Sequence, residues 1–262
     1  MDQGMIDAAV DRLMRVRGEH KPLHTFPEGA EPSTLGDAYA VQNALVARMD
    51  RAPYGWKIGC TSKLAQEMSN TNEPFYGRMF ADTSFDSPAT VDAASFFHPI
   101  VEPEIAFKLG RDLTADGAPF TQAKLLDAVA AMYPAIEVVD SRYEGGWPIT
   151  IVPTVADNGV HGCFVRGPDV PDWRDVDRAS IPLTASVNGE FVADGIGSNA
   201  LNDPMNALVW LANAATRRGH VLKAGDVVTT GNICNAPIFA KPGDTAVAEF
   251  GGLGTVGITF GQ

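Results

Sequence analysis

The sequence predicts an α+β protein, with a helical N-terminal region over residues 1–95 and a β domain over residues 96–262. Apolar residues recur at helical spacing near the N-terminus. From about residue 97, short β-branched runs alternate with turns that contain Gly, Pro and Asn. The 262 residues have an ordinary apolar and charged balance, so the chain can bury one large core. We therefore expect helices beside a mostly antiparallel or mixed sheet.

The first ninety residues are predicted to be helical, with two clear helices. The first covers residues 5–17, where apolar side chains repeat every three or four positions. The second begins at Ser33 or Thr34, residue types that cap helices, after a loop rich in Pro and Gly.

Turn residues define the strands of the C-terminal half. Asn188-Gly189 lies between two strand-like runs and predicts a type I′ hairpin. Gly-Asp turns at 225–226 and 243–244 precede β-branched runs at 227–230 and 245–250.

Two helices are expected to interrupt these strands, one near 121–132 and one near 204–218. The second has the clearer ends, because Asp203 can cap it, Pro204 suits its first position and Gly219 follows its basic end.

Charge and cysteine content exclude several classes of function. Twenty basic residues against 32 acidic ones give a net charge of −12, so we expect neither nucleic acid nor an anionic membrane as a partner. The three cysteines are too few and too scattered for a disulfide framework or a zinc site. No leader-like or membrane-spanning apolar stretch is apparent. These features predict a reduced, cytoplasmic protein.

The most informative segment is 100–109, which contains Glu102 and Glu104 in an apolar run. In a strand, both carboxylates lie on one face, about 6.6 Å apart along the chain. Such a pair is costly when partly buried, and a hard divalent cation is the usual compensation. The alternative is a solvated strand face that binds nothing.

Glu137 is the third candidate ligand, because apolar neighbours on both sides place it in a buried strand. Three carboxylates leave positions open on an octahedral Mg²⁺ or Mn²⁺ for a bidentate 2-oxo acid. The alternative is that Glu137 pairs with an arginine.

Lys57 is a lone cation among aromatic, glycine and aliphatic residues. In that setting a lysine can hold a substrate carboxylate or act in proton transfer. The alternative is a side chain that extends to solvent.

From about residue 34 to the C-terminus, the chain resembles the 2-oxopent-4-enoate hydratase and 2-oxo-3-hexenedioate decarboxylase group of the fumarylacetoacetate hydrolase superfamily. The motifs that carry this resemblance occur in order along the chain. They lie at 37–42, 55–62, 101–107, 134–142, 157–158, 202–213, 225–231 and 241–254.

The resemblance implies a mixed β-roll that holds one Mg²⁺ or Mn²⁺ on Glu102, Glu104 and Glu137, beside a helical N-terminal region. It implies a small 2-oxo acid or 2-hydroxydienoate as substrate. Lys57 matches the active-site lysine of the group, and Asp82 matches one of two adjacent aspartates that often follow a Tyr-Gly pair. A homo-oligomer and a partner decarboxylase or hydratase are further expectations from the group.

Two departures from the group bear on mechanism. Ala81 stands where the first of the two aspartates is usual, which weakens a two-carboxylate account of proton transfer. His161 stands where small residues are usual, and in the pocket it would add a group that titrates near neutral pH. The alternative is a histidine that donates to a backbone carbonyl at a strand end. We take Lys57, Asp82 and His161 as the catalytic candidates.

The predicted activity is that of a hydro-lyase, which adds water to a 2-hydroxydienoate or 2-oxo-enoate from aromatic meta-cleavage catabolism and gives a 4-hydroxy-2-oxo acid. The first alternative is decarboxylation of a 2-oxo-3-enedioate. In that reaction too, a metal-bound 2-oxo group takes up the negative charge that develops on the substrate. Arg78 is a candidate for a second substrate carboxylate, or else a surface charge.

A second alternative is C–C bond hydrolysis of acylpyruvates, which the hydrolase branch performs with a Glu–His pair in an N-terminal lid. His20, His24 and Glu28 lie in a loop that could supply that pair. A third alternative, from a different class, is a metal-binding scaffold without activity, or a subunit that supports a partner enzyme.

Overall fold

The structure is a computed structural model that describes all 262 residues. Its main elements are six α-helices and thirteen strands. The helices are α1 (Gln3–Glu19), α2 (Leu35–Met49), α3 (Lys63–Met68), α4 (Gln122–Leu126), α5 (Ile151–Ala156) and α6 (Pro204–Arg217). The strands are β1 (Pro53–Gly59), β2 (Phe75–Phe80), β3 (Ser84–Asp86), β4 (Ala89–Asp92), β5 (Pro99–Leu109), β6 (Val129–Asp140), β7 (His161–Arg166), β8 (Pro182–Val187), β9 (Glu190–Ile196), β10 (Val227–Thr229), β11 (Ile238–Phe239), β12 (Thr245–Glu249) and β13 (Thr255–Gly261).

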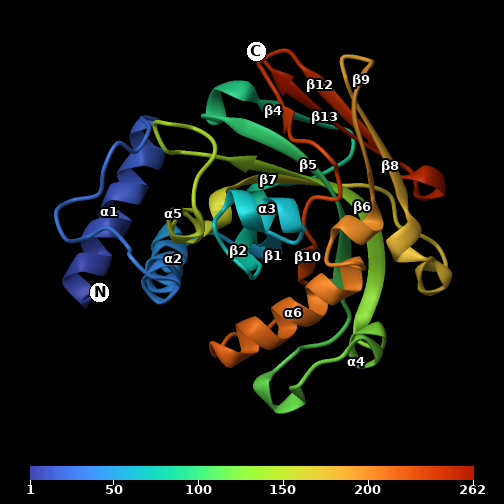
Figure 1. Cartoon of the computed structure of the whole chain (residues 1–262), viewed down its shortest axis with the longest axis horizontal. Coiled ribbons are helices and arrows are strands. Elements are labelled where there is room, and N and C mark those ends of the chain that lie inside the picture. Colours follow the sequence, from blue (N-terminus) through green and yellow to red (C-terminus); the bar gives the residue numbers. More distant parts are fainter.

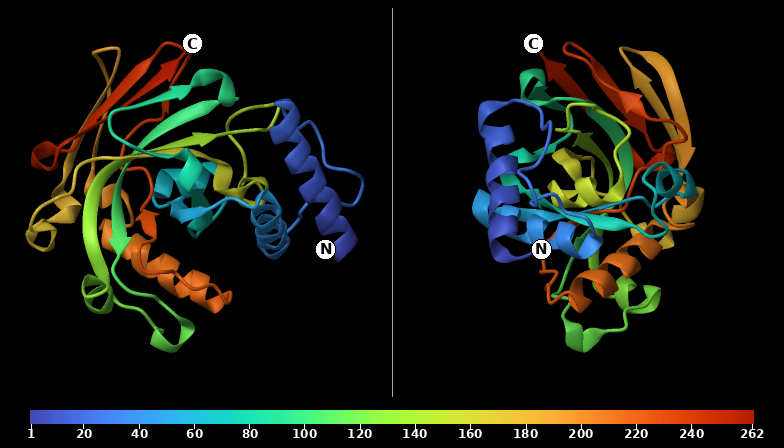
Figure 2. Two further views of the ribbon diagram at one scale, coloured as in Figure 1. Left: turned by 180° about the vertical axis from the view of Figure 1, so that it is seen from behind. Right: turned by 60° about the vertical axis from the view of Figure 1, so that its left-hand side comes forward.

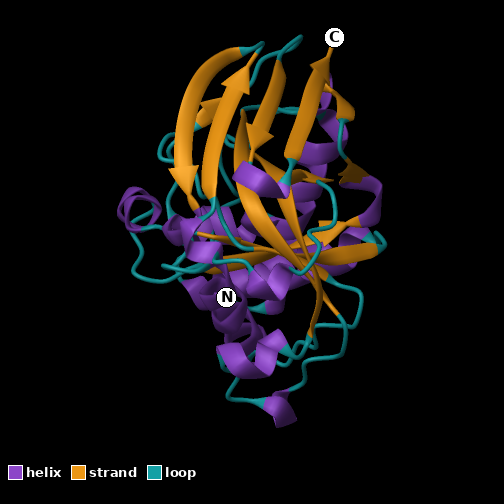
Figure 3. Ribbon diagram, turned by 90° about the vertical axis from the view of Figure 1, so that its right-hand side faces the viewer, coloured by secondary structure: helices purple, strands orange, loops and turns teal.

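The strands form two mixed sheets, whose strand directions differ clearly in Figure 3. The larger sheet has the order β2-β1-β10-β5-β6-β7-β3, with β11 paired to the free part of β5. The smaller sheet has the order β4-β13-β12-β8-β9. Three pairs are parallel, namely β1 with β10, β3 with β7 and β4 with β13, and the others are antiparallel. The α+β class predicted from the sequence is thus confirmed.

The helices α1 and α2 lie side by side at one end of the molecule, and α6 lies beside α4 in the lower part of Figure 1 (Figure 1, Figure 2). Thr34 caps α2 in a capping box with Asp37. Asp203 caps α6, with Pro204 at its first turn. These ends are the ones that the sequence predicts.

The N-terminal region is less helical than the sequence predicts. The two long helices end at Met49, and β1 to β4 follow between Pro53 and Asp92 as members of the two sheets. The expected boundary at residues 95 and 96 therefore does not mark a change from helix to strand. The pattern misleads because β1 is buried on both faces, so it lacks the alternation of a half-exposed strand.

The predicted helix over 121–132 is also shorter in the structure. The helix α4 ends at Leu126, and β6 begins at Val129. Residues 129–132 pair with β5 instead, so long-range pairing overrides their helical spacing. The hairpin at Asn188-Gly189 is present between β8 and β9, with both residues at positive φ. No helix has the length and apolarity required to cross a membrane.

Candidate metal centre and active site

Three carboxylates converge where β5 pairs with β6. Glu102 lies directly opposite Glu137 in the antiparallel register, and Glu104 follows two positions later on the same face. The nearest oxygens of Glu102, Glu104 and Glu137 all lie within 4.8 Å of one another. We call these three residues the carboxylate cluster.

The cluster is short of hydrogen-bond donors. Glu104 and Glu137 are completely buried, and Glu102 is partly buried. Glu104 accepts one hydrogen bond, from the Gly231 backbone N–H at 2.7 Å. The other oxygen of Glu104 has no hydrogen-bond partner, and the Oε2 of Glu137 has only its ion-pair contact with the Lys57 Nζ. A buried carboxylate oxygen without a partner is the kind of donor that a hard divalent cation takes, so the residues fit a metal.

Electrostatics leads to the same conclusion. Burial raises the pKa of Glu102 to about 7, against the opposing effect of Lys57. Burial, with the neighbouring Glu137 and Glu102, raises the pKa of Glu104 well above its usual value. Three charges at this spacing are therefore unfavourable without a compensating cation.

Gly231 is needed beside Glu104 for a steric reason. Its φ is +94°, and a Cβ there would lie 2.0 Å from the Thr61 Oγ1. Only glycine lets this loop approach closely enough for its N–H to reach the Glu104 carboxylate.

Lys57 is fully buried beside the cluster and does not extend to solvent. Its Nζ lies 3.1 Å from the Glu137 Oε2 and donates to the Gly159 carbonyl at 3.2 Å. Burial alone would lower the pKa of Lys57, but Glu137, Glu102 and Glu104 outweigh it and raise the pKa above its usual value. Lys57 is therefore a cation.

His161 is the first residue of β7, and its Nδ1 lies 2.8 Å from the Glu137 Oε1. The imidazole is buried, and its Nε2 has no partner. Burial lowers the pKa of His161 despite the carboxylate. Its partner is thus Glu137, not the backbone carbonyl of the alternative considered from the sequence.

The structure does not bring Asp82 to the cluster. Asp82 lies in a short 3₁₀ turn after β2, where an exposed carboxylate receives hydrogen bonds from Arg51 at 2.5 to 2.9 Å. Lys57 pairs with Gly77 of β2, and the strand then runs about 10 Å further before it ends at Phe80. The Tyr-Gly motif thus begins near Lys57 but ends away from it.

A cavity of about 320 Å³ opens beside the cluster. Lys57 and Glu102 line it together with mostly apolar side chains. Asp82 and Arg78 are not among the lining residues. Arg78 instead lies over the Trp56 ring, with its guanidinium carbon 3.7 Å from the ring centroid.

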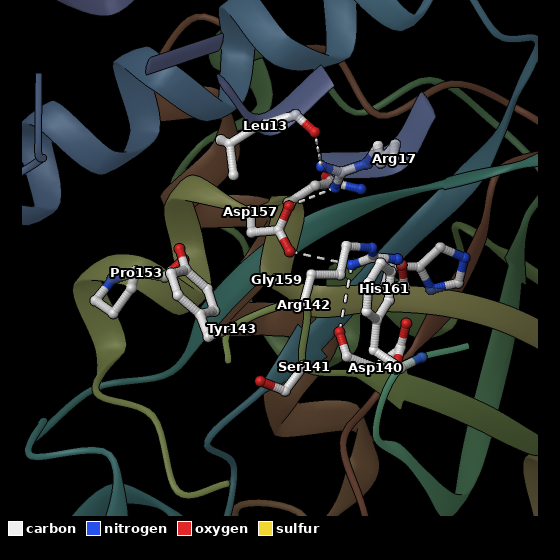
Figure 4. Close-up of polar contacts among 12 residues, drawn as sticks. Leu13, Arg17, Asp140, Ser141, Arg142, Tyr143, Pro153, Asp157, Gly159 and His161 are labelled. Carbon is white, nitrogen blue, oxygen red and sulfur yellow. Dashed lines mark hydrogen bonds and ion pairs between the residues drawn. The ribbon is translucent and has the colours of Figure 1, made fainter. Parts of the chain in front are cut away.

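A buried ion network contacts the backbone of His161 (Figure 4). Asp157 is completely buried between Arg17 of α1, at 2.5 Å, and Arg142, at 3.1 Å. Arg142 also donates to the His161 carbonyl at 2.7 Å. No local pattern in the sequence indicates a role for Arg17, Arg142 or Asp157. Among these residues, only Asp157 and Arg142 lie in motifs that carried the resemblance.

The residues proposed for a Glu–His pair do not reach the cavity. His24 contacts Glu144, and both side chains are exposed. His20 stacks on Phe97. Neither histidine nor Glu28 lines the cavity, so the hydrolase arrangement considered from the sequence is not present.

Known proteins resemble this chain over nearly its whole length. Residues 59–260 match the family model for the C-terminal domain of fumarylacetoacetate hydrolase. The chain is 40% identical over 263 residues to the 2-keto-4-pentenoate hydratase of Burkholderia vietnamiensis strain G4, covering 99% of this chain and 98% of that protein. It is 33% identical over 265 residues to the 2-hydroxyhexa-2,4-dienoate hydratase of Comamonas testosteroni, covering 99% and 98%.

Among solved structures, the fold is similar to that of 4-oxalocrotonate decarboxylase from Pseudomonas putida G7, which is complexed with magnesium and adipate. The TM-score is 0.91 at 27% identity, and the match covers 99% of this chain and 98% of that one.

Proposed function

Since this chain belongs to the fumarylacetoacetate hydrolase family, and is similar over its full length to that family's 2-keto-4-pentenoate hydratases, we propose that it is a metal-dependent hydro-lyase. It adds water to a 2-hydroxydienoate or 2-oxo-enoate and gives a 4-hydroxy-2-oxo acid. The observation that carries this proposal is the buried carboxylate cluster, with the Lys57 Nζ 3.1 Å from Glu137, at the side of a mostly apolar cavity.

Glu102, Glu104 and Glu137 would hold the metal, which we propose to be Mg²⁺, with Mn²⁺ as a substitute. All-oxygen ligand sets suit these ions, and a similar structure contains magnesium. When bound, the cation supplies Lewis-acid stabilisation of the negative charge that develops on the substrate's 2-oxygen.

Lys57 is proposed to bind the C1 carboxylate of the substrate. Its Nζ is held by Glu137 and the Gly159 carbonyl, and its side chain lines the cavity. A cation in a buried site attracts a carboxylate much more strongly than it would in water. Gly159 makes room for this arrangement, because a Cβ there would lie 2.9 Å from the Lys57 Cδ.

The reaction needs two proton movements. The 2-hydroxyl of the dienol loses a proton while the far end of the diene gains one, which gives a conjugated enone. The oxygen of water then bonds to C4 and a proton adds to C3, so the product is heavier by one water. His161 is proposed to orient Glu137, and Asp82 is given no part in these steps because Arg51 holds it outside the cavity.

Decarboxylation remains the second candidate because of the similarity to a decarboxylase. We also propose, from the resemblance to the group, that the chain acts as a homo-oligomer in the cytoplasm, in the catabolism of meta-cleavage products, beside a partner decarboxylase.

The proposal is tested with freshly generated 2-hydroxypenta-2,4-dienoate and purified protein. With Mg²⁺ we expect the dienol absorbance to decay and mass spectrometry to show a product heavier by one water, whereas EDTA prevents both. Glu102→Gln should lower the rate at least about 100-fold. The exposed Glu190→Gln, which makes the same change away from the cavity, should leave it unaltered. Loss of CO₂ instead of gain of water would favour the decarboxylase reading.

A further inference from the structure

A second group of polar side chains lies on the face of β1 and β2 that points away from the carboxylate cluster. Lys57 pairs with Gly77 across these strands, and its neighbour Trp56 pairs with Arg78. Successive side chains of a strand point to opposite faces of the sheet. Trp56, Arg78 and Tyr76 therefore lie on the face opposite to Lys57, and none of these three lines the cavity.

Tyr76 is at the centre of this second group. Its ring centroid lies 4.7 to 6.3 Å from those of Tyr39, Trp56, Trp210 and His220. Tyr76 is completely buried, and its hydroxyl has no hydrogen-bond partner. The Nε2 of His220 is also buried and also has no partner. Buried polar atoms without a partner are rare because each one costs free energy, so two of them side by side indicate a ligand.

Two arginines lie against the rings of this group. The guanidinium carbon of Arg78 is 3.7 Å from the Trp56 ring centroid, and that of Arg218 is 5.9 Å from the Tyr76 ring centroid. Neither arginine forms an ion pair with a carboxylate. The Arg78 guanidinium donates no hydrogen bond within the protein, and that of Arg218 donates only to the Ala214 carbonyl, at 3.4 Å. We call Tyr76, Arg78, Arg218 and His220 the arginine cluster.

Every side chain of the arginine cluster can donate a hydrogen bond. Burial raises the pKa of Tyr76 to about 12, against the opposing effects of Arg218 and Arg78, so the hydroxyl keeps its proton. Burial, together with Arg78 and Arg218, lowers the pKa of His220, so the imidazole is neutral and one of its nitrogens carries a proton. Both arginines thus act on both of the groups that have no partner.

The carboxylate nearest to this charge has other partners. Asp226 is close enough to act on the charge of Arg78. However, its Oδ2 already accepts hydrogen bonds from the Trp56 Nε1 at 2.8 Å and from the Lys223 backbone N–H at 2.9 Å. In a chain with a net charge of −12, the arginine cluster is a local excess of positive charge, and such a patch attracts anions.

We propose that the arginine cluster is a binding site for a small oxyanion of the phosphate type, separate from the carboxylate cluster. Guanidinium groups bind such ions through paired hydrogen bonds, and the Tyr76 hydroxyl and the His220 imidazole supply further donors. Arg78 is partly exposed and Arg218 is exposed, so an ion in solution can reach both. Arg78 lies on β2 and Arg218 directly follows α6, so a bound ion connects these two elements and stabilises the folded chain.

Isothermal titration with inorganic phosphate tests the site. The protein is titrated in EDTA, so that no metal ion brings phosphate to the carboxylate cluster. We expect one phosphate per chain. Arg78→Gln and Arg218→Gln should each weaken binding at least about tenfold, because each removes a charged donor. The matched control is Arg217→Gln, which removes the exposed arginine next to Arg218 and should leave phosphate binding unchanged.

Tyr76→Phe distinguishes an anion site from a packing role. The substitution removes only a hydroxyl that has no partner in the protein, so the Tm measured without phosphate should stay the same or rise. Phosphate should nevertheless bind this variant about fivefold more weakly than it binds the unaltered protein. In the unaltered protein, phosphate should raise the Tm more than sodium chloride does at equal ionic strength.

Three results would overturn the anion site: no binding of phosphate, an equal loss of affinity in Arg217→Gln, or full affinity in Tyr76→Phe. If phosphate does not bind and the Arg78→Gln and Arg218→Gln variants instead have a lower oligomer mass by light scattering, these arginines bind a carboxylate of a second copy of this chain. The small-anion site is then also wrong. None of these results affects the proposed function, because the arginine cluster lies outside the cavity.

Discussion

Glu102 makes the metal-free protein sensitive to pH. Burial raises its pKa from the usual 4.5 to about 7, so the folded chain binds more protons than the unfolded chain between those values. The free energy of unfolding should then fall as the pH rises from about 4.5 through 7, by about 3 kcal/mol. The raised pKa of Glu104 also makes the free energy of unfolding fall as the pH rises. The lowered pKa of Glu137 affects the free energy of unfolding only at pH values below the usual pKa of a glutamate.

Calorimetry in EDTA between pH 5 and pH 8 measures this effect as a decrease in Tm. Glu102→Gln removes one of the two groups with a raised pKa, so the decrease in Tm should be smaller, with the remainder due to Glu104. A metal-free protein whose Tm rises across this window would show that Glu102 is stabilised as an anion without a cation.

His161 is the second side chain, besides Lys57, that pairs with Glu137 of the cluster. His161→Leu leaves the Glu137 Oε1 without its partner at 2.8 Å, so we expect the affinity for Mn²⁺ to fall at least about tenfold. His161→Asn, which restores a donor, should recover part of the loss. Titration calorimetry with Mn²⁺ provides the readout. His24→Leu removes an exposed histidine and should change nothing, and equal losses for both variants would contradict the assignment.

The ion network of Arg17, Asp157 and Arg142 connects helix α1 to the segments that follow β6 and precede β7. Arg17→Met leaves completely buried Asp157 with Arg142 as its remaining cation, and we expect a loss of about 3 kcal/mol in unfolding free energy. Arg48→Met breaks the exposed pair between α2 and Asp11 of α1 and should cost at most about 1 kcal/mol. Urea unfolding of both variants makes the comparison, and equal costs would show that the buried network does not hold α1.

Elements with strong local signals could be predicted, and elements that depend on distant partners could not. The Asp203 cap, Pro204 and the apolar spacing define α6 before any folding partner is known. In contrast, residues 129–132 have helical spacing but join β6, because pairing with β5 satisfies their backbone in the core.

For the whole molecule, the sequence indicated which residues could hold the metal but not what lies around them. The alternation in β5 predicted the shared face of Glu102 and Glu104, and the buried run in β6 singled out Glu137. The position of Asp82 depends on where β2 ends, and the network of Arg17 and Asp157 joins residues 140 positions apart. Neither the position of Asp82 nor this ion network corresponds to a local sequence pattern, because both arise from packing between distant segments.

The unequal burial of the three carboxylates bears on the order in which a metal ion and a substrate can bind. Glu104 and Glu137 are sealed from solvent, and only Glu102 lines the cavity. A cation that binds the cluster would therefore reach it from the cavity that Glu102 lines. A substrate in the same cavity would lie between that ion and the solvent, so we expect metal to bind before substrate and to exchange slowly while substrate is bound.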